Sequence, residues 1–162
     1  MTIRKYDRIL EASIDEKDRR IMNLLQQNGR MTLKEIGKKV GLSIDSVNKR
    51  VKKLLEANRM HIGAFINPKA LGYDLVAGVS IKISNAGDEQ YKEFIDYLVK
   101  SPHTIEVITT LGEFDVICVF IAKDTEDLDT IYRHIRSQFK DIIAGWESSI
   151  NLKVHKFEEY SL

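Results

Sequence analysis

The residues best suited to chemistry lie between Ser43 and Glu56, where cationic side chains and small polar groups share one short segment. The members that could bind a ligand are Ser43, Asp45, Ser46, Lys49, Arg50, Lys52 and Lys53. Lysine and arginine neutralise phosphates, and they also read guanine edges in the major groove. The segment therefore predicts a nucleic-acid-binding surface, and the alternative is a charged helix face that contacts only water.

The charge of the chain is unevenly distributed along its length. Residues 30–61 carry a net charge of +6, whereas residues 62–162 carry −6 and residues 1–29 carry +1. The near-neutral total therefore combines a basic N-terminal part, residues 1–61, which we call the basic head, with an acidic remainder. Such an asymmetry predicts that a polyanion binds at one end of the chain only.

The composition is that of a soluble globular protein with one domain or two small ones. Of its 162 residues, 43% are hydrophobic and 30% are charged, which is too apolar for a disordered chain. The single cysteine, Cys118, lies in the apolar run VICVFIA and is expected to be a buried thiol in a reducing compartment. Since the sequence shows neither a membrane span nor a signal peptide, a cytoplasmic location without membrane contact is expected.

Three helices are expected in the basic head. The first begins after Asp15, which caps it, and ends at Gly29, where glycine suits the left-handed conformation. Thr32 caps a second short helix, Gly41 provides a tight turn, and Ser43 opens the third helix. At about 100° per residue, the third helix carries apolar residues on one side and cations on the other. This pattern predicts a helix-turn-helix, whose second helix enters the major groove of DNA.

The segments that flank these helices are less regular. Residues 1–13 have apolar residues at roughly helical spacing and predict a short N-terminal helix. Residues 59–66 read as a short strand, which could form a wing or ribbon after the third helix. Residues 67–73 contain Pro68 and Gly72 and are expected to form the hinge between two domains.

The remainder of the chain, residues 74–162, alternates strand and helix patterns in the order β-α-β-β-α-β. Strands are expected at 75–84, 104–111, 116–123 and 147–157, and helices at 88–100 and 124–139. The predicted fold class is α+β, with an N-terminal helix-turn-helix domain over residues 1–66 and a C-terminal ferredoxin-like domain of four antiparallel strands. One face of that sheet carries apolar residues, which are most simply covered by a second copy of the chain.

Several ordered motifs resemble the Lrp/AsnC family of feast/famine transcriptional regulators. They are the opening IDEKDRRIMNLLQ, the pattern G-L-S-x-x-x-V-x-x-R-V from Gly41, the hinge P-x-x-L-G from Pro68 and the turn GEFD from Gly112. The resemblance covers residues 14–156 and implies a regulator that binds double-stranded DNA. It also implies dimers paired through their sheets and assembled into tetramers or octamers, with an amino acid bound between dimers.

The resemblance also implies which residues form the two sites. DNA contacts fall on Thr32, Ser43, Asp45, Ser46, Lys49, Arg50 and Lys53. Effector contacts fall on Thr109, Thr110, Gly112, Glu113, Phe114 and Asp115. Chemically, free amides at a glycine turn take a carboxylate and Asp115 takes an ammonium group. The alternative is that GEFD is only a hairpin turn in which Phe114 packs. Leu111 stands where the family has threonine, which changes the expected polar contacts.

Two alternative functions remain to be compared with the sequence. Siroheme decarboxylases share a similar two-domain plan and place histidine and arginine around the hinge, but the hinge segment NPKALG of this chain has no histidine. RNA binding by the sheet would need basic and aromatic residues on one strand, which ITTLGEFDVICVF does not offer. The histidines and Cys118 lack the spacing of metal ligands, so no metal, no cofactor and no catalytic residue is expected.

Overall fold

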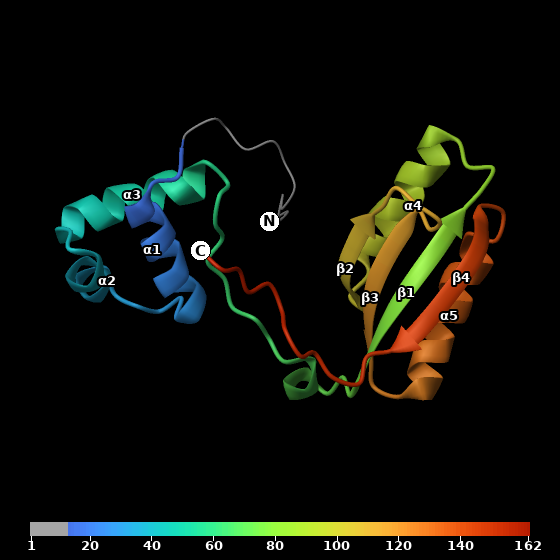
Figure 1. Cartoon of the computed structure of the whole chain (residues 1–162). Helices are drawn as coiled ribbons and strands as arrows, with labels where there is room; N and C mark the ends of the chain where they lie inside the picture. The colour runs from blue at the N-terminus through green and yellow to red at the C-terminus, as the bar shows by residue number, and fades with distance from the viewer. Residues whose placement is uncertain (1–12) are drawn as a thin grey trace. The chain divides into compact units, whose positions relative to one another are not determined.

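A computed structural model describes residues 13–162 of the chain (Figure 1). The helix expected over residues 1–13 therefore lies almost entirely outside the described residues. The chain forms two compact units, one made of the residues up to Phe65 together with Lys156–Leu162, and one made of Ile66–His155. We call them the helical unit and the sheet unit. The C-terminal residues, which the sequence placed with the second domain, lie here in the helical unit.

The helical unit contains three α-helices that begin where the capping residues predict. They are α1 (Glu16–Gln27), α2 (Leu33–Val40) and α3 (Ile44–Glu56). Asp15, Thr32 and Ser43 each accept a hydrogen bond from the backbone amide three residues later, which satisfies an amide that the helix itself leaves free. Gly41 ends α2 with a φ of 68°, the left-handed conformation that glycine adopts without strain.

One apolar face from each helix builds the core of this unit. The buried residues are Ile21, Leu25, Ile36, Val40 and Val47. Gly37 allows α2 to pack closely on the turn, because a Cβ at this position would lie 2.6 Å from the carbonyl oxygen of Leu42. The α2–α3 corner therefore requires glycine at position 37 as well as at Gly41, a requirement that the sequence pattern alone did not reveal.

Three local expectations about this region were wrong or incomplete. Residues 59–66 form no strand and are mostly exposed. Gly29 has no positive φ, and α1 ends instead with Asn28 in an extended conformation. The hinge contains a 3-10 helix, η1 (Pro68–Leu71), and Gly72 after it has a φ of 82°.

The sheet unit has the predicted β-α-β-β-α-β order. Its elements are β1 (Leu75–Ile83), α4 (Asp88–Lys100), β2 (Thr104–Thr109), β3 (Val116–Ala122), α5 (Thr125–Gln138) and β4 (Ile143–Ile150). The strands are antiparallel in the order β2-β3-β1-β4. Figure 1 shows α4 and α5 covering the same face of the sheet. The predicted α+β fold is confirmed. Among the residues described, no helix is long and apolar enough to cross a membrane.

The core of the sheet unit lies between this covered face and the two helices. Its fully buried members include Val79, Ile81, Phe94, Leu98, Val116, Cys118, Phe120 and Ile135. Burial raises the pKa of the Cys118 thiol to about 12, so the predicted buried cysteine is confirmed. Trp146 of β4 packs edge-on against Tyr132 with ring centres 5.1 Å apart, and both rings also contact Phe120.

The last strand begins and ends earlier than expected. The sequence predicted it over residues 147–157, whereas β4 pairs with β1 only as far as Ile150, opposite Ala77. Because the two strands are antiparallel, only the first two residues of β1, Leu75 and Val76, lie beyond this point. Leu152 and Val154 therefore find no neighbouring strand and stay 94% and 65% exposed. Alternation predicted an extended chain correctly, but not where the paired strand ends.

Candidate functional site

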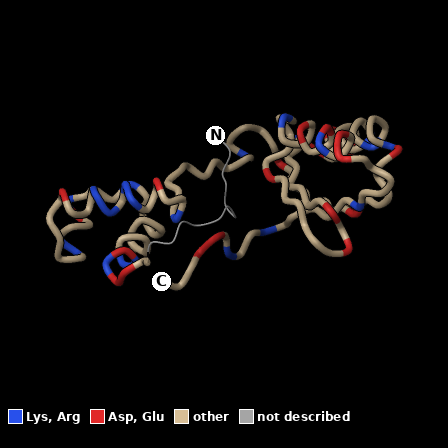
Figure 2. Tube along the Cα trace, turned by 90° about the horizontal axis from the view of Figure 1, so that it is seen from above, with Lys and Arg blue, Asp and Glu red and all other residues tan. Residues whose placement is uncertain are grey.

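The third helix presents its polar residues to solvent. Ser43, Asp45, Lys49 and Lys53 are exposed, and Ser46 is half-buried beside them. By helical geometry Asp45, Lys49 and Lys53 lie on the side of α3 that faces away from the buried Val47 and Leu54, whereas Ser43 precedes the helix as its N-cap. In Figure 2 the lysine and arginine positions recur along the helices of the helical unit. The predicted DNA-contact residues of α3, apart from Arg50, therefore share one exposed side.

Two of the predicted contact residues also serve as helix caps. The Ser43 hydroxyl donates to Oγ of Ser46 over 2.9 Å and accepts from its amide over 3.2 Å. The Thr32 hydroxyl donates to a carboxylate oxygen of Glu35 over 2.7 Å, and it accepts from the Glu35 amide. The bond from the Thr32 hydroxyl, and then a bond from the Thr32 amide over 2.8 Å, lower the pKa of the Glu35 carboxyl. The small hydroxyl residues therefore fix where α2 and α3 begin, in addition to any contact with DNA.

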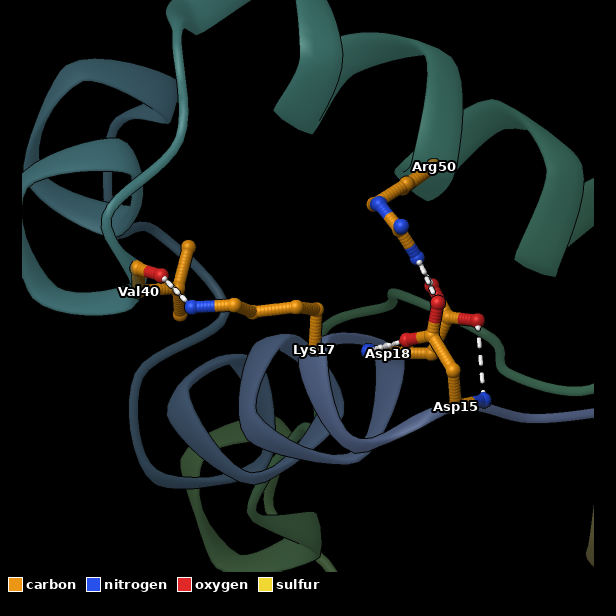
Figure 3. Close-up of polar contacts among 5 residues, drawn as sticks. All are labelled: Asp15, Lys17, Asp18, Val40 and Arg50. Atoms are coloured by element: carbon orange, nitrogen blue, oxygen red, sulfur yellow. Dashed lines mark hydrogen bonds and ion pairs between the residues drawn. The ribbon is translucent and has the colours of Figure 1, made fainter.

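Arg50 occupies a different position from the other cations of α3. Its guanidinium donates to Asp15 over 2.6 Å and to Asp18 over 2.7 Å, as Figure 3 shows. Asp18 is the one charged residue found buried in the described part of the chain, with 7% of its surface exposed. Arg50 therefore joins the middle of α3 to the N-terminal turn of α1 and satisfies a buried carboxylate.

The same contacts perturb the ionisation of both partners. The amide of Asp18 and then the Arg50 guanidinium hold the pKa of the Asp15 carboxyl below its usual range. The hydrogen bonds to Asp15 and Asp18 in turn raise the pKa of Arg50. No local pattern indicates this pairing, because the partners lie more than 30 residues apart along the chain.

Two further cations of α1 fix the end of α2. The Lys17 ammonium group donates to the carbonyl of Val40, as Figure 3 shows, and the Arg20 guanidinium donates to the carbonyl of Lys39 over 2.7 Å. Carbonyls at a helix C-terminus lack partners within the helix and carry partial negative charge, so cations stabilise them. Polar contacts from α1 thus position both α2 and α3.

The predicted effector residues lie in the turn that joins β2 to β3. The Thr110 amide donates to the carbonyl of Asp115 over 2.8 Å, and the Thr110 hydroxyl donates to the carbonyl of Phe114. These bonds close the turn internally, so Thr110 is occupied within it. At the tip, Leu111, Gly112 and Glu113 are exposed, and Leu111 is completely so.

Asp115 connects the turn to the neighbouring strand. Its amide donates to the carbonyl of Ile81 over 3.0 Å, and one carboxylate oxygen accepts from the Ile83 amide over 2.7 Å. Tyr91 of α4 lies close enough to feel this charge: burial and then the Asp115 carboxylate raise the pKa of its phenol. Helical spacing marked Tyr91 only as an apolar-face residue, so its neighbourhood with the turn was missed.

The sheet face opposite α4 and α5 carries an apolar strip. It includes Ile108 of β2, Ile117 and Val119 of β3, and Val76 of β1, none of which is fully buried. Ile117 is 37% exposed. Contiguous apolar surface of this kind marks an interaction site in soluble proteins.

Comparisons with known proteins agree with this arrangement. Residues 14–55 match the family model of the AsnC-type helix-turn-helix domain, and residues 76–160 match that of the Lrp/AsnC ligand binding domain. The HTH-type transcriptional regulator FL11 of Pyrococcus abyssi is 36% identical over 154 residues, covering 91% of this chain and 95% of its own. The HTH-type transcriptional regulator Ptr1 of Methanocaldococcus jannaschii is 36% identical over 118 residues, covering 71% and 76%.

A solved structure shows the same fold over nearly the whole chain. The transcriptional regulator NMB0573 of Neisseria meningitidis, in complex with L-Met, aligns with a TM-score of 0.80 at 24% identity, covering 90% of this chain and 94% of its own. The relatives are transcription regulators, so the tetrapyrrole-enzyme alternative is not supported. The two family matches together span most of the sequence, and the chain therefore belongs to the Lrp/AsnC family of transcription regulators, with a helix-turn-helix domain and a ligand-binding domain.

Proposed function

We propose that the exposed side of α3 contacts the major groove of double-stranded DNA. The residues proposed to contact it are Thr32, Ser43, Asp45, Ser46, Lys49 and Lys53. The observation that carries this proposal is the separation of cations on α3: Lys49 and Lys53 are exposed, whereas Arg50 is held by Asp15 and Asp18. In this proposal Arg50 orients the helix, and the free lysines bond to phosphates and bases.

The salt dependence of DNA affinity tests this division of roles. Each phosphate contact contributes about −0.9 to the slope of log affinity against log salt. Lys49→Ala and Lys53→Ala should each make the slope shallower by about that amount. Lys123→Ala, which removes an exposed cation from the sheet unit, is the matched control. Unchanged slopes for both α3 variants would show that the recognition face lies elsewhere.

We propose that a second copy of the chain covers the apolar strip on the open sheet face. A symmetric dimer of this kind would present two α3 helices to successive major grooves about 34 Å apart, on a roughly palindromic site. Further assembly into tetramers or octamers is proposed from family resemblance alone. Ile117→Lys should convert a dimer to a monomer in sedimentation experiments, and a variant that stays dimeric would contradict this interface.

We propose that an amino acid binds at the β2–β3 turn. The exposed backbone around Gly112 and Glu113 can receive the carboxylate, and the Asp115 oxygen that does not bond to Ile83 can receive the ammonium group. Thr109, Thr110 and Phe114 complete the proposed site. The L-Met complex of the Neisseria regulator supports this class of ligand. Leu111 is fully exposed at the tip of the turn. It contributes apolar surface at the position where the threonine hydroxyl of the family would favour a polar ligand.

Calorimetry with each of the twenty standard amino acids tests the effector site. Asp115→Asn keeps a hydrogen-bond acceptor for Ile83 but removes the charge, so it should weaken binding of the ammonium group by tenfold or more, equivalent to about 1.4 kcal/mol. Glu126→Gln, the same charge change at an exposed position of α5 outside the turn, is the control. Undiminished binding by Asp115→Asn would refute the role of this residue. In this proposal the ligand changes the affinity for DNA, and DNA must then change the affinity for the ligand by the same factor. We propose that both events take place in the cytoplasm.

A further inference from the structure

The last residues of the chain return to the helical unit. Residues Lys156–Leu162 belong to it, although all the residues between Ile66 and His155 belong to the sheet unit. The sheet unit is consequently attached to the helical unit at both of its ends, through the hinge and through the C-terminal segment. We call Lys156–Leu162 the tail.

The side chain of Gln26 holds the tail at its far end. Gln26, in the last turn of α1, donates from Nε2 to the carbonyl of Tyr160 over 2.9 Å. The Tyr160 amide donates back to Oε1 of Gln26 over 3.0 Å. One carboxamide therefore pairs with both polar groups of a single backbone residue, as a neighbouring β-strand would. Such a contact selects an extended backbone and is indifferent to the Tyr160 side chain.

An aromatic contact supports the tail at its near end. Phe157 packs edge-on against Phe65, with ring centres 5.3 Å apart. Both side chains remain more than half exposed, so the contact buries little apolar surface and mainly orients the start of the tail. The two contacts hold the tail against the helical unit at positions 157 and 160.

We infer that Gln26 is a backbone clamp for the tail, and that the clamped tail ties β4 of the sheet unit to α1 of the helical unit. Only residues 151–159 separate the end of β4 from Tyr160. A displacement of β4 is therefore passed along a short covalent path to the helix that positions α3 through Asp15 and Asp18. The value of this connection for regulation rests on the proposed function.

Hydrogen exchange of the full-length protein tests the clamp without DNA. Gln26→Ala removes both hydrogen bonds to Tyr160 and should raise the exchange rate of the Tyr160 amide by at least about fivefold, the increase expected from loss of a single net hydrogen bond. The matched control is Gln27→Ala, at an exposed neighbouring position of α1. Tyr160→Pro removes the donor from the tail itself, away from any core, and should speed tryptic cleavage after Lys156. The clamp would be overturned if Gln26→Ala exchanged the Tyr160 amide no faster than the wild type and the control, and if Tyr160→Pro were cleaved after Lys156 no faster than the wild type.

A second arm tests the connection to β4. Adding duplex DNA at low salt should alter exchange at the β4 amides in the wild type, and this response should be reduced in Tyr160→Pro. If the wild type binds DNA without any response at β4, the connection is wrong while the clamp stands. If neither the wild type nor any variant binds DNA, the proposed function fails. Hydrogen exchange and tryptic cleavage without DNA still test the clamp in that case.

Discussion

Replacing Arg50 separates a structural role from a DNA-contacting one. In Arg50→Ala, Asp18 loses its charged partner while it stays buried, and the link between α1 and α3 is removed. Lysine at the same position would keep a charge but reach fewer acceptors, since only a guanidinium presents several donors in a fixed plane. Arg50→Lys should therefore restore part of the lost stability.

The expected cost follows from the exposure of the two contacts. Asp15 has half of its side chain exposed, and that contact is screened by solvent. The Asp18 side chain is only 10% exposed, so breaking its bond to Arg50 should cost about 1–2 kcal/mol. For a unit of this size, that loss corresponds to a fall of roughly 5–10 °C in melting temperature.

The assay pairs thermal unfolding with DNA titration. Unfolding is followed by residue-specific signals from the helical unit, such as those of Ile21 and Val47, and binding is followed over a range of salt concentrations. Arg50→Ala should melt earlier and keep its salt slope, whereas Lys49→Ala should melt normally and have a shallower slope by about 0.9. An Arg50→Ala protein that melts with the wild type and loses one phosphate contact would refute the reasoning.

Three other predictions follow from local chemistry. Folding lowers the pKa of Asp15 below its usual value of 3.8. The stability that this residue contributes is therefore fully present above pH 3.8 and is lost as the pH falls through the lowered pKa. In an acid titration of the free energy of unfolding, Arg50→Ala should lose less stability than the wild type over this range. Ser43→Ala removes the cap of α3 and should destabilise the helical unit by about 1 kcal/mol in urea unfolding; an unchanged stability would contradict the capping role. Cys118, with a pKa of about 12 and no exposed surface, should react with thiol reagents at pH 8 only after the sheet unit unfolds; rapid labelling of native protein would contradict its burial.

Local signals in the sequence were sufficient for the six α-helices and β-strands of the sheet unit, the three helices of the helical unit and their order, although they also predicted a strand over residues 59–66 that does not form. Caps such as Ser43 are visible because the stabilising side chain stands next to the amide that it satisfies. The βαββαβ order is visible because apolar residues change period from helix to strand. The polar links of Arg50 and Gln26 were invisible, since each joins residues far apart along the chain and ordinary surface side chains carry no mark of a distant partner.

In the candidate sites, too, local sequence patterns predicted some features, whereas contacts between distant residues could not be predicted. Exposure of Lys49 and Lys53 followed from helical spacing, and a hairpin around Gly112 followed from two flanking strand patterns. Spacing places Arg50, three residues after Val47 and four before Leu54, next to the buried side of α3. It could not identify the partner on α1 that decides the role of this residue. The proximity of Tyr91 to Asp115 depends on how α4 packs on the sheet, which no local pattern specifies.

The aromatic cluster around Trp146 has a practical consequence. Trp146 is the single tryptophan of the chain, and its ring lies against Tyr132 and Phe120 beneath the sheet. Light absorbed at the red edge of the protein spectrum is therefore emitted from one half of the molecule only. A plain fluorimeter can follow melting of the ligand-binding half while the DNA-binding half stays optically silent, so the order in which the two halves come apart can be measured without any label.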